Sequence, residues 1–424
     1  MLKGKRVVIV GAGFAGLHCA QVLSNNPNFS VTLIDRNDYQ QFQPLLYQVA
    51  TGALSTQNAA FNLRMLFEYS ANVEVKTSTI VSVDLETKTA TGETGDRYEA
   101  DYLVLAAGSE VNFFNTKGAL QMSYPLYSLR DAERLRSRIY SLLEAADLKH
   151  SSAVSQSMSI VVIGGGPTGI ETAGAIADLL RLTPHNLYPN VDLSAVSVSL
   201  IDSSHALLKP FTVQSQEYAK RVLEERGVNV RLSKRVKQVR KDSVLLDDET
   251  SLDATLVIWA GGLEAATLSR AVGIGTGKGG RIDVDGDLTV RAHPNVYALG
   301  DFANCRDHDG AMLPQLASVA QQAGRHCAKN IMAHTNGEDR TPFKYVDKGI
   351  LAMVGRNAGI AEVGPSHFPL NGPFAFAAWL GVHASLLTSF RANLESLVEW
   401  TWDYAREIPM NPINDQVDEM GATV

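Results

Sequence analysis

The fold is decided near the amino terminus by the stretch Val7-Val8-Ile9-Val10-Gly11-Ala12-Gly13-Phe14-Ala15-Gly16. The run Val7–Val10 is β-branched throughout, as in a strand buried on both faces of a parallel sheet. A glycine loop follows it, and apolar residues at helical spacing then continue to Leu23. A second strand, Val31–Ile34, ends at Asp35 and completes a βαβ unit.

The three glycines of this loop predict a dinucleotide site. The chain must turn tightly at Gly11, expose bare backbone to a pyrophosphate at Gly13, and bring helix close to strand at Gly16. The free N–H groups at the start of the helix and its dipole then attract the phosphates. Asp35 ends the next strand, where its carboxylate can accept both hydroxyls of an adenosine ribose.

A second unit of the same kind lies in the middle of the chain. A strand over Ser159–Ile163 is followed by the loop Gly164-Gly165-Gly166-Pro167-Thr168-Gly169. A helix is predicted over Ile170–Leu180, and the strand Val196–Ile201 ends at Asp202. The chain therefore carries two predicted dinucleotide sites.

Asp202 bears on which nucleotide the second site takes. Its carboxylate suits a free ribose 2′-hydroxyl and would repel a 2′-phosphate, which usually needs an arginine. No Arg or Lys follows it at once, since the next residues are Ser203-Ser204-His205. The sequence therefore favours NADH over NADPH.

Three further strands end in glycine and extend the two units. They run into Ala107-Gly108, Gly261-Gly262 and Gly300-Asp301. This pattern predicts an α/β fold with two Rossmann-like dinucleotide-binding domains, the second inserted in the first, and a C-terminal helical region. The predicted boundaries are 1–110 and 285–330 for the first domain, 111–284 for the second and 331–424 for the C-terminal segment, with the serine-rich stretch 151–159 as a linker.

The composition is that of a globular protein with a real core. Of the 424 residues, 45% are hydrophobic and 20% are charged, and the net charge of -7 gives no basic face for nucleic acid. The three cysteines, Cys19, Cys305 and Cys327, form no Cys-x-x-Cys pair, so neither a disulfide framework nor a metal site is expected. Each is interpreted as a small packed residue.

Membrane contact, if any, is expected to be peripheral. The first strand follows Met1–Arg6 directly, which leaves no room for a secretory signal or transit peptide. No stretch reaches the roughly 18 uninterrupted apolar residues of a spanning helix.

The opening stretch, Ala107-Gly108 and the run Val296–Asp301 together resemble the pyridine nucleotide-disulfide reductase superfamily. The resemblance implies FAD at the first glycine loop and NAD(P)H at the second, with Asp301 on the ribityl and pyrophosphate part of the flavin. Disulfide reductases and sulfide:quinone oxidoreductases need suitably placed cysteines, which this sequence lacks.

Within the superfamily, the chain resembles the type II NADH dehydrogenases over residues 6 to about 404. The resemblance implies electron transfer from NADH through FAD to a quinone without proton pumping, a homodimer, and a C-terminal region that touches the membrane. The matching segments are Gln41-Phe42-Gln43-Pro44-Leu45-Leu46-Tyr47-Gln48-Val49-Ala50-Thr51-Gly52, Gly164–Gly174, Tyr345–Gly349, Val354–Arg356, Trp379–His383, Phe390–Arg391 and Trp400–Trp402.

The motifs and the resemblance together give the candidate site residues. For FAD they are Gly11, Ala12, Gly13, Phe14, Ala15, Gly16, Asp35, Arg36, Gln43, Tyr47, Val81, Ala107, Gly108, Gly300, Asp301, Ala317 and Lys348. For NADH they are Gly164, Gly166, Pro167, Thr168, Gly169, Glu171, Asp202 and Gly262. No metal ligand is predicted.

Glu171 and Lys348 are the candidate catalytic residues. Glu171 is expected in the first turn of its helix, where a carboxylate is often only favoured by the dipole. The alternative is that it orients nicotinamide or relays protons to the acceptor. Lys348 is either a solvated loop charge or, as the resemblance implies, a cation near the N1/O2 edge of the flavin.

The acceptor pocket is expected around Ala317, Ser318, Gln321 and Gln322. Here the sequence departs from the family, because Ser318 stands where a glutamine is usual in Pro314–Gln322. A shorter hydroxyl leaves room, or a water, where an amide would reach an acceptor carbonyl.

The C-terminal segment carries an apolar stripe at helical spacing: Trp379, Val382, Leu386, Leu387, Phe390, Leu394, Leu397 and Val398. Spacing alone favours a helix that packs on its own core or on a second subunit, whereas the resemblance favours dimer and membrane contact. The expected location is the cytoplasm, peripheral on the inner face of the cell membrane.

Three functions follow as hypotheses. The first is a peripheral NADH:quinone oxidoreductase. The second is a soluble NADH-dependent flavin reductase of another acceptor, and the third is a non-catalytic flavin-bearing NADH sensor.

Overall fold

A computed structural model describes residues 4–148, 158–307, 309–364 and 366–386. The chain divides into two compact units. Unit 1 comprises residues 1–40, 61–110 and 263–346, and unit 2 comprises residues 41–60, 111–262 and 347–424. These units are defined by packing, so the predicted boundaries of the ligand-binding domains stay a prediction.

Unit 1 is built on a six-stranded sheet whose neighbouring strands are parallel, apart from one antiparallel edge pair. The residues of β1 that were predicted to be buried, Val7–Val10, are indeed buried, because β1 pairs with a strand on each side. The order is β21 (Thr289–Val290), β22 (His293–Ala298), β9 (Tyr102–Leu105), β1 (Lys5–Val10), β2 (Phe29–Asp35) and β5 (Val73–Thr77).

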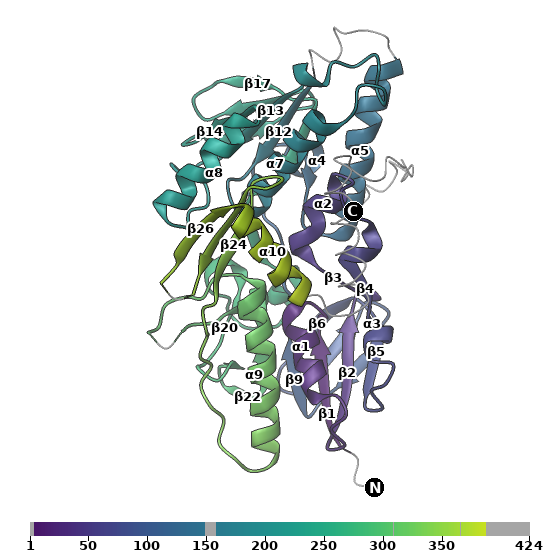
Figure 1. Cartoon of the computed structure of the whole chain (residues 1–424). Helices are drawn as coiled ribbons and strands as arrows, with labels where there is room; N and C mark the ends of the chain where they lie inside the picture. The colour runs from purple at the N-terminus through teal and green to yellow at the C-terminus, as the bar shows by residue number, and fades with distance from the viewer. Residues whose placement is uncertain (1–3, 149–157, 308, 365, 387–424) are drawn as a thin grey trace. The chain divides into compact units, whose positions relative to one another are not determined.

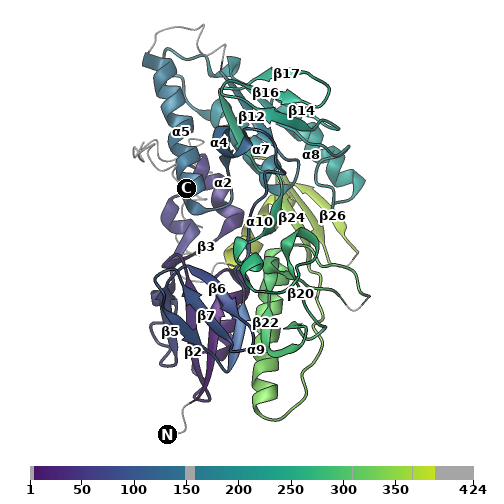
Figure 2. The same ribbon diagram turned by 180° about the vertical axis from the view of Figure 1, so that it is seen from behind.

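Two helices cover one face of this sheet in Figure 1, α1 (Phe14–Leu23) and α9 (Ala317–Thr335). They pack closely because Gly324 lies against the Ala15 carbonyl with no room for a side chain. A three-stranded meander lies on the other side, as Figure 2 shows: β6 (Ile80–Asp84), β7 (Thr89–Gly92) and β8 (Arg97–Glu99).

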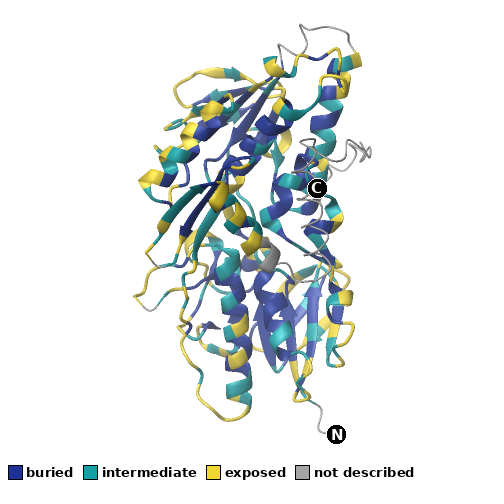
Figure 3. Ribbon diagram, in the orientation of Figure 1, coloured by how far each residue is buried: buried dark blue, intermediate teal, exposed yellow. Residues whose placement is uncertain are grey.

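Unit 2 contains a five-stranded, all-parallel sheet. Its order is β11 (Tyr124–Pro125), β18 (Leu256–Trp259), β12 (Ser159–Ile163), β13 (Ser197–Ile201) and β14 (Val228–Arg231). Helices join β11 to β12, β12 to β13 and β13 to β14, which gives these connections the length that parallel pairing requires. The main helices are α5 (Leu129–Leu148), α7 (Pro167–Leu182) and α8 (Val213–Glu225). The central strands of the parallel sheets in both units are largely buried (Figure 3).

Unit 2 also holds two antiparallel sheets. One is the meander β15 (Val236–Val239), β16 (Ser243–Leu246) and β17 (Ser251–Asp253). The other consists of β24 (Gly349–Met353), β25 (Gly359–Val363) and β26 (Phe368–Gly372), against which α10 (Pro373–Leu386) packs.

Short elements complete the chain. They are β3 (Tyr39–Gln41), α2 (Leu46–Ala50), β4 (Ala60–Asn62), α3 (Leu63–Leu66), β10 (Ser109–Val111), α4 (Ala119–Met122), β19 (Leu263–Ala265), β20 (Ile282–Asp283) and β23 (Ala303–Asn304).

The second nucleotide helix begins earlier than the sequence pattern predicted. Helix α7 starts at Pro167, with Gly166 as its N-cap, rather than at Ile170. Proline is well suited to the first helical position because its fixed φ matches the helix and its missing N–H has no partner there. Glu171 is consequently the fifth residue of the helix, and its expected place in the first turn was wrong.

The C-terminal predictions are only partly within the described residues. Helix α10 ends at Leu386, and the stripe from Leu387 to Val398 lies outside them. In α10, Trp379 is buried whereas Phe374 is 83% exposed, so Phe374 is the aromatic side chain available to an interface. Within the described part of the chain, none of the helices combines the length and apolarity needed to cross a membrane.

Candidate active site

The first glycine loop has the geometry that its sequence predicted. Gly11 has φ +100°, and a side chain there would overlap the Ala106 carbonyl. Gly16 lies against the Gly11 carbonyl, so helix and strand touch. Among the described residues, a Cβ at Gly13 would meet nothing within 4 Å, and none of their side chains caps the helix that Gly13 begins. The loop therefore offers an open space beside uncapped N–H groups, which fits a pyrophosphate.

Asp35 closes this loop from the end of β2. Its Oδ2 accepts a hydrogen bond from the Ala12 N–H at 2.7 Å, and its Oδ1 accepts one from the Asn37 N–H at 2.8 Å. Burial raises the pKa of this carboxyl, although the backbone N–H groups oppose the shift. Each oxygen keeps a further lone pair for a ribose hydroxyl.

The other predicted FAD residues of unit 1 gather at the same edge of the sheet. Gly300 lies against the Cβ atoms of Ala15 and Ala320, between α1 and α9. Asp301 follows it, and its Oδ2 accepts a hydrogen bond from Ser109 Oγ at 2.9 Å. Burial raises the pKa of Asp301, with Ser109 and then Arg281 acting in the opposite direction.

The remaining FAD residues of unit 1 differ in exposure. Ala107 and Gly108 follow β9, where Gly108 has φ +72°, and Ala317 is the first residue of α9. Arg36 and Val81 are exposed.

The second glycine loop repeats the first in unit 2. Gly164 has φ +116°, Gly169 lies against the Gly164 carbonyl, and a Cβ at Gly166 would meet nothing within 4 Å. Asp202 Oδ2 accepts a hydrogen bond from the Gly165 N–H at 2.5 Å, and its Oδ1 accepts one from the Ser204 N–H at 2.6 Å. This loop fits a second pyrophosphate and ribose in the same way.

Three further NADH candidates lie around this loop. Pro167 and Thr168 are exposed at the start of α7. Gly262 has φ +83°, and a side chain there would overlap the ring of Phe114. A larger residue at position 262 would therefore be strained as well as crowded.

Glu171 is a buried carboxyl whose hydrogen bond leaves its own helix. Its Oε1 accepts from the Met353 N–H of β24 at 3.1 Å. Burial raises the pKa of Glu171 to about 8, with the Met353 bond opposing the shift. The carboxyl is therefore mainly protonated at neutral pH. Tyr47 is buried close by, and burial followed by the charge of Glu171 raises the pKa of its phenol.

Lys348 lies at the other end of the same strand. It is exposed and directly precedes β24, which begins at Gly349 and ends at Met353. Among the described residues, Lys348 forms no ion pair. Strand β24 thus links the two candidate catalytic residues, because Lys348 precedes its first residue and Glu171 bonds to its last residue, Met353. The strand rises roughly 3.3 Å per residue.

Among the residues that the structure describes, the buried side-chain atoms that lack a hydrogen-bond partner include the amide atoms Gln43 Oε1 in unit 2 and Gln315 Nε2 in unit 1. A buried polar atom without a partner is costly unless a ligand or water satisfies it. Gln43 was a predicted FAD residue, so its free oxygen fits a bound group. Gln315 was not predicted, and it lies just before the acceptor segment.

The acceptor candidates lie on the first turns of α9. Ser318 Oγ and the Tyr345 hydroxyl are 2.9 Å apart in a hydrogen bond. The Gln322 amide bonds both backbone groups of Val346, donating to its O and accepting from its N at 3.0 Å each. Gln321 is buried. Ser318 therefore presents a pair of hydroxyls, its own and that of Tyr345, in place of one long amide.

The cysteines are buried and free. Cys19 of α1 and Cys327 of α9 share a side-chain hydrogen bond, and burial followed by this neighbour raises the pKa of Cys327 well above its usual value. Buried thiols of raised pKa are poor nucleophiles. Their interpretation as packed residues is confirmed.

Sequence reasoning missed Ser109, Gln315 and Tyr345. Ser109 and Tyr345 matter through hydrogen bonds to Asp301 and Ser318, and Gln315 through a buried nitrogen without a partner among the described residues. None of these features is apparent in the local sequence. Two of them lay in segments singled out from the sequence: Tyr345 begins the Tyr-Val-Asp-Lys-Gly segment, and Gln315 lies in Pro314–Gln322.

The fold and the two loops define a class of protein. The model of the family described as pyridine nucleotide-disulphide oxidoreductase matches residues 5–324. That span includes both glycine loops and Asp301. The molecule is thus an oxidoreductase built around two dinucleotide sites.

Relatives narrow the class. The chain is 32% identical over 415 residues to the type II NADH:quinone oxidoreductase NdhA of Mycobacterium tuberculosis, covering 93% of this chain and 86% of that protein. It is 31% identical over 411 residues to Ndh of the same organism, covering 93% and 87%. The chain belongs to the type II NADH:quinone oxidoreductases, within the pyridine nucleotide-disulphide oxidoreductase family, and the predicted family is confirmed.

A solved structure agrees with the fold. NDH2 from Plasmodium falciparum, in complex with NADH, superposes with a TM-score of 0.88 at 22% identity, over 96% of this chain and 99% of that one. The predicted α/β class with its two dinucleotide folds is confirmed.

Proposed function

We propose that this chain catalyses the reaction NADH + H⁺ + quinone → NAD⁺ + quinol with FAD as its resident cofactor. Bound FAD would supply the two-electron chemistry that joins the oxidation of NADH to the reduction of the quinone. The observation that carries the proposal is the pair of glycine loops, each open at its middle glycine and each closed by an aspartate.

The residues of the chain bind the two nucleotides and orient them. The first loop, with Asp35 and Asp301, holds the flavin nucleotide, and the second, with Asp202, holds NADH through its free 2′-hydroxyl. The exposed Lys348 would supply a positive charge to the bound flavin.

Glu171 holds a proton. Since its Oε1 accepts from Met353, Oε2 is the oxygen that carries the proton below pH 8. Quinone reduction consumes protons, and a carboxyl with a pKa near the working pH is suited to supply one.

The acceptor end of the proposal rests on Ser318 and Tyr345. Each hydroxyl can rotate about its C–O bond and has one hydrogen to donate. One of the two can therefore donate to the other, and the second then donates its own hydrogen to an acceptor carbonyl. We infer a site that takes a quinone carbonyl at shorter reach than a glutamine would allow.

Steady-state NADH oxidation with and without a short-chain quinone tests the function. Rapid oxidation that requires quinone is expected, with a several-fold higher KM for quinone in Tyr345→Phe. Turnover that ignores quinone would point to a reductase of another acceptor, and reduced flavin that persists without turnover would point to a sensor. Ser318→Gln compares this hydroxyl pair with the amide that is usual in the family: turnover should fall if the hydroxyl pair binds the quinone carbonyl, and improved turnover would show that an amide binds it better.

Membrane contact is proposed for the C-terminal region, because a quinone substrate resides in the bilayer. The exposed Phe374 is the described residue that supports it, and the inner face of the cell membrane and a homodimer remain parts of the same proposal. Co-sedimentation with phospholipid vesicles should weaken in Phe374→Ser. Analytical ultracentrifugation of the holoprotein reads out the dimer.

A further inference from the structure

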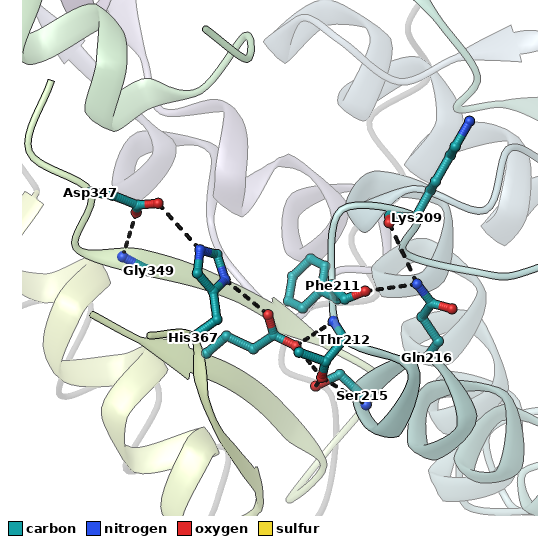
Figure 4. Close-up of polar contacts among 9 residues, drawn as sticks. Lys209, Phe211, Thr212, Ser215, Gln216, Asp347, Gly349 and His367 are labelled. Atoms are coloured by element: carbon teal, nitrogen blue, oxygen red, sulfur yellow. Dashed lines mark hydrogen bonds and ion pairs between the residues drawn. The ribbon is translucent and has the colours of Figure 1, made fainter. Parts of the chain in front are cut away.

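A cluster of three charged side chains adjoins Lys348 in unit 2. Figure 4 shows His367 reaching toward Asp347 on one side and toward the start of α8, at Thr212 and Ser215, on the other. His367 Nδ1 lies 3.0 Å from Glu362 Oε2, and its Nε2 lies 3.2 Å from Asp347 Oδ2. None of these three residues belongs to the predicted site.

Glu362 is the fixed end of the cluster. It is 1% exposed on β25, and its Oε1 accepts hydrogen bonds from the Thr212 N–H and hydroxyl, both at 2.7 Å. Burial alone would raise the pKa of Glu362, but bonds from Thr212, Ser215 and His367 lower it overall. The carboxylate is thus charged and anchored to the N-cap of α8.

His367 is the bridge between the two acids. It stands at φ +49° in the turn between β25 and β26, a conformation that His adopts more readily than most residues. A carboxylate lies on each ring nitrogen, so both nitrogens can donate to a carboxylate when the ring is protonated. The bond to Glu362 chiefly, and then the bond to Asp347, raises the pKa of His367, whereas burial lowers it. Among the described residues, the uncharged Thr212 and Ser215 at the start of α8 bond to Glu362.

Asp347 is the other end of the cluster, and it directly precedes Lys348. Its Oδ1 accepts from the Gly349 N–H at 2.8 Å, so both of its oxygens are engaged. The Gly364 N–H of the same turn donates to the Lys348 carbonyl at 3.2 Å. The backbone on both sides of Lys348 is therefore tied to the His367 turn.

We propose that His367 is a positioning residue, which clamps the Asp347–Gly349 loop between Glu362 and the β25–β26 turn and so fixes Lys348 where the flavin needs its charge. This inference rests on the proposed role of Lys348. The clamp is closed while the ring is protonated and opens as the pH rises through the raised pKa of His367.

The two-electron reduction potential of FAD in the holoprotein tests the proposal. Lys348→Gln should lower the equilibrium constant for reduction of the cofactor about tenfold, which lowers the reduction potential by about 30 mV. His367→Gln should lower the same equilibrium constant roughly three- to tenfold, which lowers the reduction potential by about 15–30 mV. In the double variant, His367→Gln should add nothing, because it acts through Lys348. The matched control is His293→Gln, which removes a histidine that lies 3.7 Å from Glu86 in unit 1 and should not shift the potential.

Amide hydrogen exchange supplies a readout without turnover. The Gly349 and Gly364 amides should exchange about tenfold faster in His367→Gln, since both bonds close the loop. The difference in potential between wild type and His367→Gln should be largest at acidic pH and vanish above the pKa of His367.

The outcomes separate the two claims. An unchanged potential in Lys348→Gln would overturn the role of Lys348 itself. A lowered potential in Lys348→Gln with unchanged exchange and potential in His367→Gln would overturn the clamp alone. Full additivity in the double variant would show that His367 does not act through Lys348, which also overturns the clamp.

Discussion

The two glycine loops share one backbone frame but differ one helical turn further on. In each, the first glycine has positive φ, the middle glycine is open, the third packs on the first, and an aspartate accepts two backbone N–H groups. Seven residues after the first glycine, the first loop has His18 and the second has Glu171. Both side chains are buried.

These two equivalent side chains are both held neutral by burial. Burial lowers the pKa of His18 to about 4 and raises the pKa of Glu171 to about 8. His18 Nδ1 bonds the Phe14 carbonyl of its own helix, 2.8 Å away, whereas Glu171 bonds Met353 of another element. The same position in the two loops therefore has two different roles. His18 bonds within its own helix, whereas Glu171 bonds to strand β24, which follows Lys348.

The sharpest way to break this comparison is Glu171→Gln, which keeps the shape and removes the proton. Quinone-dependent turnover should fall about 100-fold, the range of one general acid. Wild-type activity should decline as the pH rises through about 8, because the carboxyl then loses its proton. A pH–rate profile in which Glu171→Gln keeps that alkaline limb would contradict the assignment.

The sequence predicted the frame because the frame is local. Gly11, Gly164, Asp35 and Asp202 act within a few residues or at a strand end, so spacing alone reveals them. The bonds of Ser109 to Asp301, Ser318 to Tyr345 and Glu171 to Met353 join segments far apart in the chain. No periodicity reports such pairs, and the early start of α7 was missed because glycine and proline obscured the helical pattern.

The open middle glycines separate the two ligands. Gly13→Ala should reduce the FAD that stays bound, and Gly166→Ala should raise the Kd for NADH about tenfold while FAD is retained. A Cβ at either position meets no protein atom within 4 Å, so the melting temperatures of the apoproteins should stay near that of wild type. Loss of FAD in Gly166→Ala together with weakened NADH binding in Gly13→Ala would reverse the assignment of the two loops.

The aspartates sharpen the comparison further. Asp202→Ala should reduce the preference for NADH over NADPH about tenfold, because the repulsion of a 2′-phosphate is removed. Asp35→Ala is the matched control, expected to weaken FAD retention and leave the nucleotide preference unchanged. Ratios of kcat/KM for the two nucleotides measure this, and an unchanged ratio in Asp202→Ala would contradict the ribose assignment.

The smallest effect is expected for His18→Gln. Loss of the bond to Phe14 should cost about 1 kcal/mol in the free energy of unfolding and leave turnover unchanged. Because the folded pKa is depressed, wild-type stability from this group is present above pH 6.5 and is lost as the pH falls toward 4. Denaturant unfolding at several pH values measures how the free energy of unfolding changes with pH, and this change should be smaller in the variant. A tenfold loss of turnover would show that the two positions are not used differently after all.

The central claim is that electrons enter from NADH at the Gly164 loop, pass through FAD at the Gly11 loop and leave to a quinone. An anaerobic titration of the holoprotein tests it most directly. One equivalent of NADH per bound FAD should bleach the flavin absorbance, and one equivalent of a short-chain quinone should restore it. A flavin that NADH leaves oxidised, or one that stays bleached after quinone is added, would contradict the account.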